Sequence, residues 1–192
     1  QADDIFGVSI AISGDTLVVG AELEDGGAGN PLTESGAAYV FTRNKNGANA
    51  WGEVKILRAS DRSEYDWFGN AVAISGDTIA IAARYEDGGA GNPAVDSGAA
   101  YIFTRNQGGA ENWGQVKILH ASDAQVNDEF GSSIDISGDT LIVGASMEDG
   151  GGSDPLPDSG AAYVFTRNKG GADTWGQVTI LRASDRQTND LF

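Results

Sequence analysis

Residues 6–21 read FGVSIAISGDTLVVGA, and this stretch decides the fold. Apolar and small residues alternate through its first half, which is typical of a strand with one buried face. Its second half is a continuous apolar run, which indicates a strand buried on both faces. Between the halves lies Gly14-Asp15, and glycine supplies the positive φ that tight hairpin turns require. We therefore expect a hairpin of two strands, Phe6–Ser13 and Thr16–Ala21, with the glycine at positive φ and the aspartate capping the turn.

The same stretch returns twice, at residues 68–83 and 130–145, so the chain is a tandem repeat. The spacing between copies is 62 residues, with no insertion or deletion, and a fixed period of this kind predicts repeated structural units. Phe192 stands one more period after the third Phe-Gly. We place the repeats at about 5–66, 67–128 and 129–190 of one array over 1–192, with 191–192 beginning a further repeat.

Each repeat contains four strand signals and no sustained helical periodicity, which predicts an all-β protein. In the first repeat the third and fourth strands are expected at Gly36–Thr42 and roughly Glu53–Ala59. Sheets that are apolar on both faces must pack between neighbours, and radially repeated four-stranded antiparallel blades form a β-propeller. A linear β-solenoid is the competing architecture. Since propellers close with 4–8 blades, three blades predict part of a larger propeller or one completed by other copies.

Three elements of the repeat resemble the FG-GAP family, namely Phe6-Gly7, Gly20-Ala21 and the run GAAYVF at 36–41. That family builds the propeller of integrin α subunits and occurs in bacterial surface and secreted proteins. The resemblance implies a propeller with the first strand of each blade innermost, an extracellular or cell-surface location, and a non-catalytic role in adhesion, ligand binding or assembly. Calcium-binding members carry several acids between the first two strands. Here the hairpin holds one carboxylate, too few for the six to eight oxygens of calcium, so that site is not carried over.

Composition excludes several classes of function. The formal net charge of −16 argues against nucleic-acid partners and against anionic membranes, because both need a basic surface. The apolar runs are too short for membrane insertion. The chain has no Cys and one His, so thiol catalysis, zinc-thiolate sites and multi-His metal centres are absent. Acids repeated identically in every copy favour architecture over a single asymmetric active site, and we predict that the protein is not an enzyme.

The acidic residues are predicted to gather at one end of the blades, where the loops between second and third strands meet the connections between repeats. The basic residues expected there are few: Arg62, Arg84 and Arg186. Three interpretations stay open, namely a solvated acidic surface, a divalent-cation site, and a docking surface for a basic partner. For the second, oxygen-rich loops with flexible glycines suit Ca²⁺, and the candidate ligands are Glu24, Asp25, Glu86, Asp87, Glu148 and Asp149.

The remaining aromatic residues and the histidine are assigned mainly to structure. Trp51, Trp113 and Trp175 recur at one position of each repeat, which indicates packing in or between blades. Trp67 occurs in one copy only and is a candidate for an exposed contact. His120 stands where the other copies have arginine, which suggests an ordinary exposed strand position.

The sequence thus predicts a non-catalytic extracellular binding or adhesion module, with an acidic loop face for a protein, glycan or divalent-cation ligand. Its expected partners are further repeats of the same chain or other copies of itself. The alternative is a structural subunit of a self-assembling filament or surface array, suggested by the exact period.

Overall fold

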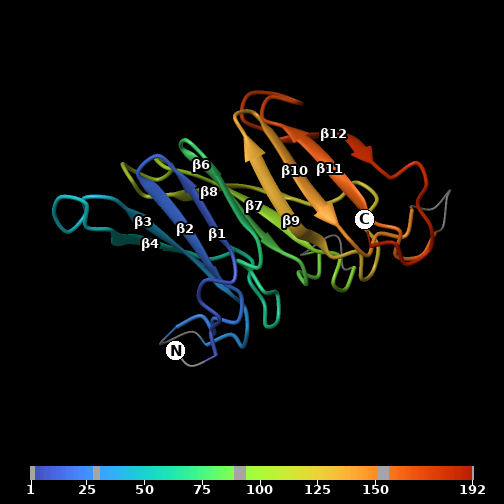
Figure 1. Ribbon diagram of the computed structural model, residues 1–192, viewed down its shortest axis with the longest axis horizontal. Coiled ribbons are helices and arrows are strands. Elements are labelled where there is room, and N and C mark those ends of the chain that lie inside the picture. The colour runs from blue at the N-terminus through green and yellow to red at the C-terminus, as the bar shows by residue number, and fades with distance from the viewer. Residues whose placement is uncertain (1–2, 28–30, 89–93, 151–155, 192) are drawn as a thin grey trace.

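The computed structural model describes residues 3–27, 31–88, 94–150 and 156–191. Within these ranges the chain forms strands and turns without helix, and the strands make three four-stranded sheets (Figure 1). No helix long and apolar enough to cross a bilayer occurs in the described ranges. The prediction of an all-β chain is confirmed.

Each sheet consists of four consecutive antiparallel strands in chain order. The first contains β1 (Ile10–Ser13), β2 (Thr16–Ala21), β3 (Ala37–Thr42) and β4 (Gly52–Leu57). The second contains β5 (Val72–Ser75), β6 (Thr78–Ala83), β7 (Ala99–Thr104) and β8 (Gly114–Leu119). The third contains β9 (Phe130–Ser137), β10 (Thr140–Ala145), β11 (Ala161–Thr166) and β12 (Gly176–Leu181). In the first sheet the second strand coincides with the prediction, and the third and fourth lie within two residues of it.

The hairpins at the start of each sheet are built as the sequence predicts. Gly14, Gly76 and Gly138 have φ of 56° in all three copies. This is the left-handed region, where a residue with a Cβ is strained and glycine is not. The glycine therefore turns the chain within two residues, and Ser13 pairs directly with Thr16.

The Phe-Gly pairs depart from the prediction of a continuous first strand. β1 and β5 begin four residues after the phenylalanine, and only β9 begins at the phenylalanine itself. Gly69 and Gly131 both have positive φ, 96° and 105°, and Gly131 lies inside β9, so the glycine conformation alone does not set where the first strand begins. A Cβ on Gly69 would lie 2.4 Å from the carbonyl oxygen of Ala37 in the preceding sheet. The glycine thus allows the backbones of neighbouring sheets to approach closely.

The three sheets stack face to face, with β5 lying against both β1 and β9 (Figure 1). One apolar cluster fills each of the two interfaces between sheets. Phe68 is fully buried in the first of them, and its ring packs edge-on against Tyr101 and Phe103 at centroid distances of 5.3 and 6.1 Å. Trp113 and Trp175 are each 1% exposed, which confirms their predicted packing role, and Trp51 is half-buried.

The connections between sheets return to the loop of the preceding sheet. The backbone N–H of Phe68 donates to the carbonyl of Ser35 over 3.1 Å, and that of Phe130 donates to Ser97 over 2.9 Å. Both sets of loops therefore lie at one end of the molecule. We call this end the loop face, formed by the described residues of 22–36, 58–71, 84–98, 120–129, 146–160 and 182–191. The opposite end, with the tight turns, is the hairpin face.

This arrangement is that of consecutive propeller blades in an open array. The pairing within each sheet is antiparallel throughout, whereas a β-solenoid would pair successive coils in parallel, so the competing architecture is wrong. The sheets do not close into a ring, which agrees with the prediction of a partial propeller.

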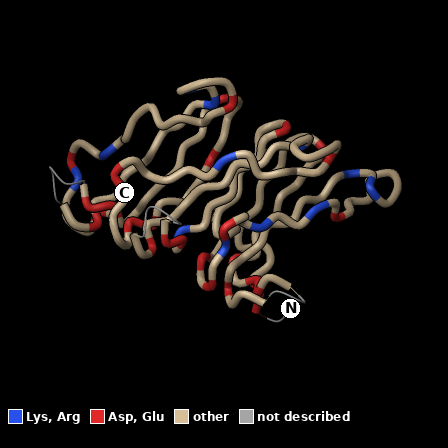
Figure 2. The backbone as a smooth tube through the Cα atoms, turned by 180° about the vertical axis from the view of Figure 1, so that it is seen from behind, with Lys and Arg blue, Asp and Glu red and all other residues tan. Residues whose placement is uncertain are grey.

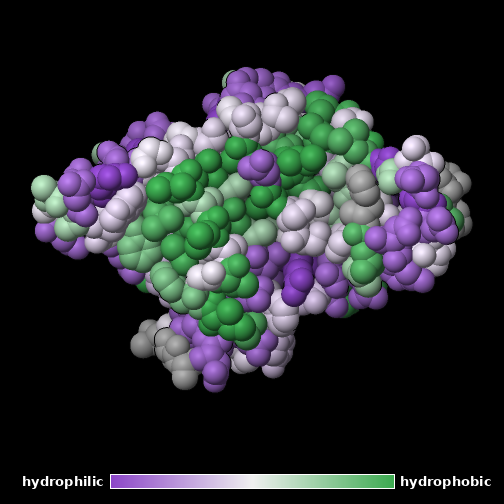
Figure 3. All heavy atoms as spheres, viewed as in Figure 1, coloured by the Kyte–Doolittle hydropathy of each residue, from purple (hydrophilic) through white to green (hydrophobic). Residues whose placement is uncertain are grey.

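The two outermost sheet faces expose apolar residues that are covered inside the array. Val72 and Ile74 of β5 are 8% and 9% exposed, but their counterparts Ile10 and Ile12 of β1 are 70% and 61% exposed. On the third sheet Leu181 is 45% exposed, whereas its counterpart in the first sheet is buried. Figure 3 shows the resulting broad hydrophobic region over the sheets.

Candidate functional site

The loop face is organised around one buried glutamate in each sheet. Glu24, Glu86 and Glu148 are 3%, 3% and 0% exposed. A buried carboxylate is costly unless it is paired and hydrogen-bonded, and two of these three have an arginine partner. Arg58 contacts Glu24 at 2.8 Å, and Arg182 contacts Glu148 at 2.6 Å.

The same glutamates and the aspartates that follow them hold the loops in shape. Glu24 Oε2 accepts the backbone N–H of Gly26 over 2.9 Å, and Asp25 Oδ1 accepts that of Glu34 over 3.0 Å. The second loop repeats both contacts, Gly88 to Glu86 at 2.7 Å and Asp96 to Asp87 at 3.1 Å, and the third loop repeats the second of them, Asp158 to Asp149 at 3.0 Å. The Glu-Asp pair therefore connects the beginning of each loop to its end.

These contacts fit a divalent cation poorly. Calcium prefers six to eight oxygen ligands. Here each buried glutamate already faces a basic side chain, and one carboxylate oxygen of each aspartate accepts a hydrogen bond from a backbone N–H. Across the described parts of the chain, no group of three or more His, Asp or Glu side chains is arranged to hold a metal ion. The six predicted metal candidates lie together in pairs, but as parts of a loop framework.

His120 does not occupy the ordinary exposed strand position that the sequence suggested. It follows the end of β8, is 29% exposed, and its Nδ1 lies 3.8 Å from Oε2 of the buried Glu86. It thus takes the place that Arg58 and Arg182 hold in the other sheets. These two arginines also correct the prediction that the loop face has few basic residues, because sequence spacing alone had assigned them to the fourth strands.

A second layer of acids surrounds the buried glutamates. Asp66 is 2% exposed and accepts the backbone N–H of Ser63. Burial is the main cause that raises the pKa of Asp66 to about 7; the hydrogen bond from Ser63 lowers it, and the nearby carboxylates of Glu86, Asp87 and Asp61 add to the rise. In the next repeat, burial likewise raises the pKa of Asp128 to about 6. The loop face therefore contains carboxyl groups that titrate near neutral pH.

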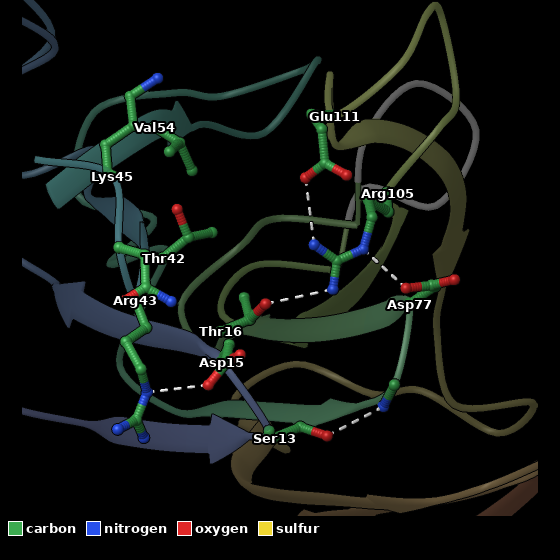
Figure 4. A pocket seen from close by; sticks show the side chains of 13 residues that line it. Ser13, Asp15, Thr16, Thr42, Arg43, Lys45, Val54, Asp77, Arg105 and Glu111 are labelled. Atoms are coloured by element: carbon green, nitrogen blue, oxygen red, sulfur yellow. Dashed lines mark hydrogen bonds and ion pairs between the residues drawn. The ribbon is translucent and has the colours of Figure 1, made fainter. Parts of the chain in front are cut away.

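The hairpin face holds a cavity of about 830 Å³ between the first and second sheets (Figure 4). Arg105 crosses it and donates to Asp77 at 2.6 Å, to Glu111 at 3.1 Å and to Thr16 of the first sheet at 3.1 Å. The predicted turn-capping aspartate is thus the partner of an arginine instead.

The same arginine contacts recur between the second and third sheets. Arg167 donates to Asp139 at 2.6 Å and to Thr78 of the second sheet at 3.0 Å. Gly138 and Gly76 each donate a backbone N–H to a serine of the sheet before, at 3.0 and 3.1 Å. Because its charged groups join one sheet to the next in both junctions, we interpret the cavity in Figure 4 as part of the framework.

A smaller pocket of about 200 Å³ opens on the loop face at the same junction of sheets. It is lined by Glu34, Tyr65, Trp67, Tyr85 and Asp96, which come from three separate segments of the chain. The prediction of Trp67 as an exposed contact was the one signal in the sequence for this pocket. The two tyrosines and the two acids were missed as a group, because no local pattern links residues 34, 65, 85 and 96.

Comparison with known proteins identifies the repeat. A family model described as FG-GAP repeat matches residues 1–41, 51–103 and 113–165, in phase with the 62-residue period. The second and third matches run from the fourth strand of one sheet to the third strand of the next, so the unit of sequence is offset from the unit of structure. No curated protein matches the chain.

Proposed function

Because the chain belongs to the FG-GAP repeat family, we propose that it is a non-catalytic extracellular binding module whose loop face meets the ligand. Fold alone does not assign a function, and the proposal therefore depends on the chemistry of that face. The buried glutamates are engaged in the loop framework, which supports a role in positioning loops over a role in catalysis.

The observation that carries the proposal is the uneven distribution of charge. Figure 2 shows Asp and Glu gathered along the edge of the molecule where the loops lie. Some of these acids are exposed, among them Asp61, Glu64, Asp87 and Asp185. Exposed charges of one sign steer an oppositely charged partner and raise its association rate more than its affinity. An acidic, loop-bearing face is suited to such recognition.

Binding to an array of extracellular-matrix proteins and glycans tests this function. We expect saturable binding to one class of ligand, with association slowed in the triple variant Asp61→Asn, Glu64→Gln, Asp185→Asn. The matched control is Glu53→Gln, Asp135→Asn, Asp173→Asn, which changes the net charge equally at exposed sites away from the loop face. Equal effects of the two triple variants would refute the assignment of the loop face.

One observation favours a second function, that of a structural subunit in a self-assembling array. The apolar residues on the outer face of the first sheet are the counterparts of those that the second sheet buries against its neighbour, and the third sheet exposes the complementary set. The third sheet of one copy therefore has the surface needed to cover the first sheet of another copy. Such head-to-tail contacts form rings if the rotation closes and filaments if it does not.

Light scattering at increasing protein concentration tests this second function. We expect growth of the particle mass, abolished by the double variant Ile10→Lys, Ile12→Lys. The control Val95→Lys, Val126→Lys places the same charges on exposed apolar residues of the loop face and should leave association unchanged. A native protein that stays monomeric at all concentrations would rule out self-assembly.

A further inference from the structure

The small pocket on the loop face has an aromatic lining that the next junction of the array does not repeat. Tyr65, Trp67 and Tyr85 line it together with two acids. One period later the same places hold Asn127, Glu129 and Met147, and one period earlier they hold Asp3, Ile5 and Leu23. The acids, by contrast, recur, since Glu34, Asp96 and Asp158 share one position. Only the junction of the first and second sheets adds three aromatic rings to the acidic frame.

The backbone conformation makes this choice of residues costly. Tyr65 has φ of 68° and Trp67 has φ of 56°, and their counterparts in the other copies have the same left-handed conformation. Asparagine and aspartate tolerate that conformation best, and they are the residues found in place of Tyr65 in the other copies. A bulky aromatic residue there is strained, and strain of this kind is retained at sites where another property is needed.

Two of the rings, Trp67 and Tyr85, are held in place by contacts from both the first and the second repeat. Trp67 and Tyr85 pack edge to face, with centroids 4.7 Å apart and an interplanar angle of 72°. The guanidinium of Arg84 lies 4.9 Å from the Trp67 ring and 4.8 Å from the Tyr85 ring, but Arg84 does not line the pocket. The Trp67 indole N–H donates to Glu34 Oε2 over 3.0 Å, which fixes the ring against the first sheet.

We propose that this pocket binds one pyranose ring of a neutral glycan, an inference that rests on the proposed role of the loop face in binding. The aromatic faces offer apolar surface for the C–H face of a sugar, and the carboxylates of Glu34 and Asp96 accept hydrogen bonds from its hydroxyls. The pocket is smaller than the roughly 300–1,000 Å³ typical of sites for drug-sized ligands, which suits a single ring.

Two other ligand classes are disfavoured by the same contacts. An anion would be repelled by Glu34 and Asp96. A cation would meet Arg84, whose guanidinium lies against the rings of Trp67 and Tyr85 and would repel a second positive charge. A neutral ligand with many hydroxyl groups meets neither penalty.

Nuclear magnetic resonance of the indole N–H groups tests the proposal directly. The chain has four tryptophans, and loss of one signal in Trp67→Leu identifies Trp67. We expect at least one of methyl α-glucopyranoside, methyl α-mannopyranoside, methyl β-galactopyranoside and methyl N-acetyl-β-glucosaminide to shift this signal alone. The shift should saturate with a Kd of roughly 1–10 mM, which corresponds to the binding free energy of a few kcal/mol expected for one small ring.

Three variants separate binding from folding. Trp67→Leu introduces the residue type found at the equivalent position 191, and its sugar binding is followed through the tyrosine signals. Glu34→Gln keeps the shape of the side chain and the acceptor for the indole N–H but removes the charge. Each variant should weaken sugar binding at least tenfold. Tyr65→Asn should also weaken binding, but it relieves the left-handed strain. It should therefore raise the melting temperature by about 2–4 °C, whereas a purely structural role of Tyr65 would lower it.

A graft tests whether the residues are sufficient. The second junction already has the acids, so Asn127→Tyr, Glu129→Trp, Ser146→Arg and Met147→Tyr should add a second site and a fifth, sugar-responsive indole signal. The proposal is overturned if none of the four glycosides shifts Trp67, or if tetramethylammonium chloride shifts it at matched ionic strength and the glycosides do not. If Trp67→Leu still binds the array of matrix proteins and glycans, the proposal for this pocket is likewise overturned, while the proposed binding function of the loop face stays intact.

Discussion

Replacing Asp66 with asparagine should stabilise the protein above pH 7 and change its stability little near pH 4.5. Asp66 is 2% exposed, accepts the backbone N–H of Ser63, and lies near the carboxylates of Glu86 and Asp61. Asparagine has the same shape and can accept the same hydrogen bond, but it stays uncharged. It therefore reproduces the protonated form of Asp66 at every pH.

The magnitude follows from the pKa of the folded state. Burial raises the pKa of Asp66 from 3.8 to about 7, so the folded protein holds this proton more tightly than the unfolded chain does. Between pH 4 and pH 7 the unfolded state binds fewer protons, and the free energy of unfolding falls as the pH rises through this window. At about 1.4 kcal/mol for each pKa unit the upper limit is about 4 kcal/mol, and we expect a gain of about 2–4 kcal/mol for Asp66→Asn at pH 8.

Guanidinium unfolding at pH 4.5 and pH 8, at one ionic strength, measures the effect. Asp128, whose pKa is also raised, contributes equally to both proteins and cancels in the comparison. The matched control is Asp190→Asn, which changes the same position of the repeat where the carboxylate is exposed and accepts the N–H of Gln187. A stability difference that is the same at both pH values, or as large for Asp190→Asn, would refute the reasoning.

Three further changes test the framework of the loops and hairpins. Arg182→Met should destabilise the protein by about 3 kcal/mol in urea unfolding, because it leaves the fully buried Glu148 without its charged partner; a loss below 1 kcal/mol would contradict this. Gly76→Val should lower the free energy of unfolding by about 1–3 kcal/mol through backbone strain alone, since φ is 56° and the added Cβ meets open space; an unchanged melting temperature would show that the turn tolerates a side chain. Millimolar calcium should leave the melting temperature equal to that in chelator at matched ionic strength, because the buried glutamates already have basic partners; a rise would restore Glu24 and its counterparts as metal ligands.

The periodic and local features of this protein are readable in the sequence. The 62-residue period, the four strands of each repeat and the hairpin glycines such as Gly14 follow from residues that are neighbours along the chain. Their signals are alternation, turn chemistry and repetition, each of which acts over a few residues. The stacking of sheets follows as well, because strands such as β6 are apolar on both faces and need neighbours on both sides.

Contacts between residues far apart in the sequence were decided only by the tertiary structure. Glu24 precedes its partner Arg58 by 34 residues, and only the return of the chain to the loop face brings the two together. From the sequence, Glu24 was therefore assigned to a possible metal site, and His120, the counterpart of Arg58, was assigned to an exposed strand position. The aromatic pocket has the same origin, since Trp67 and Glu34 meet across a junction of sheets. A repeat pattern determines which units stack, but the partners across each interface depend on how the loops of one sheet reach the next.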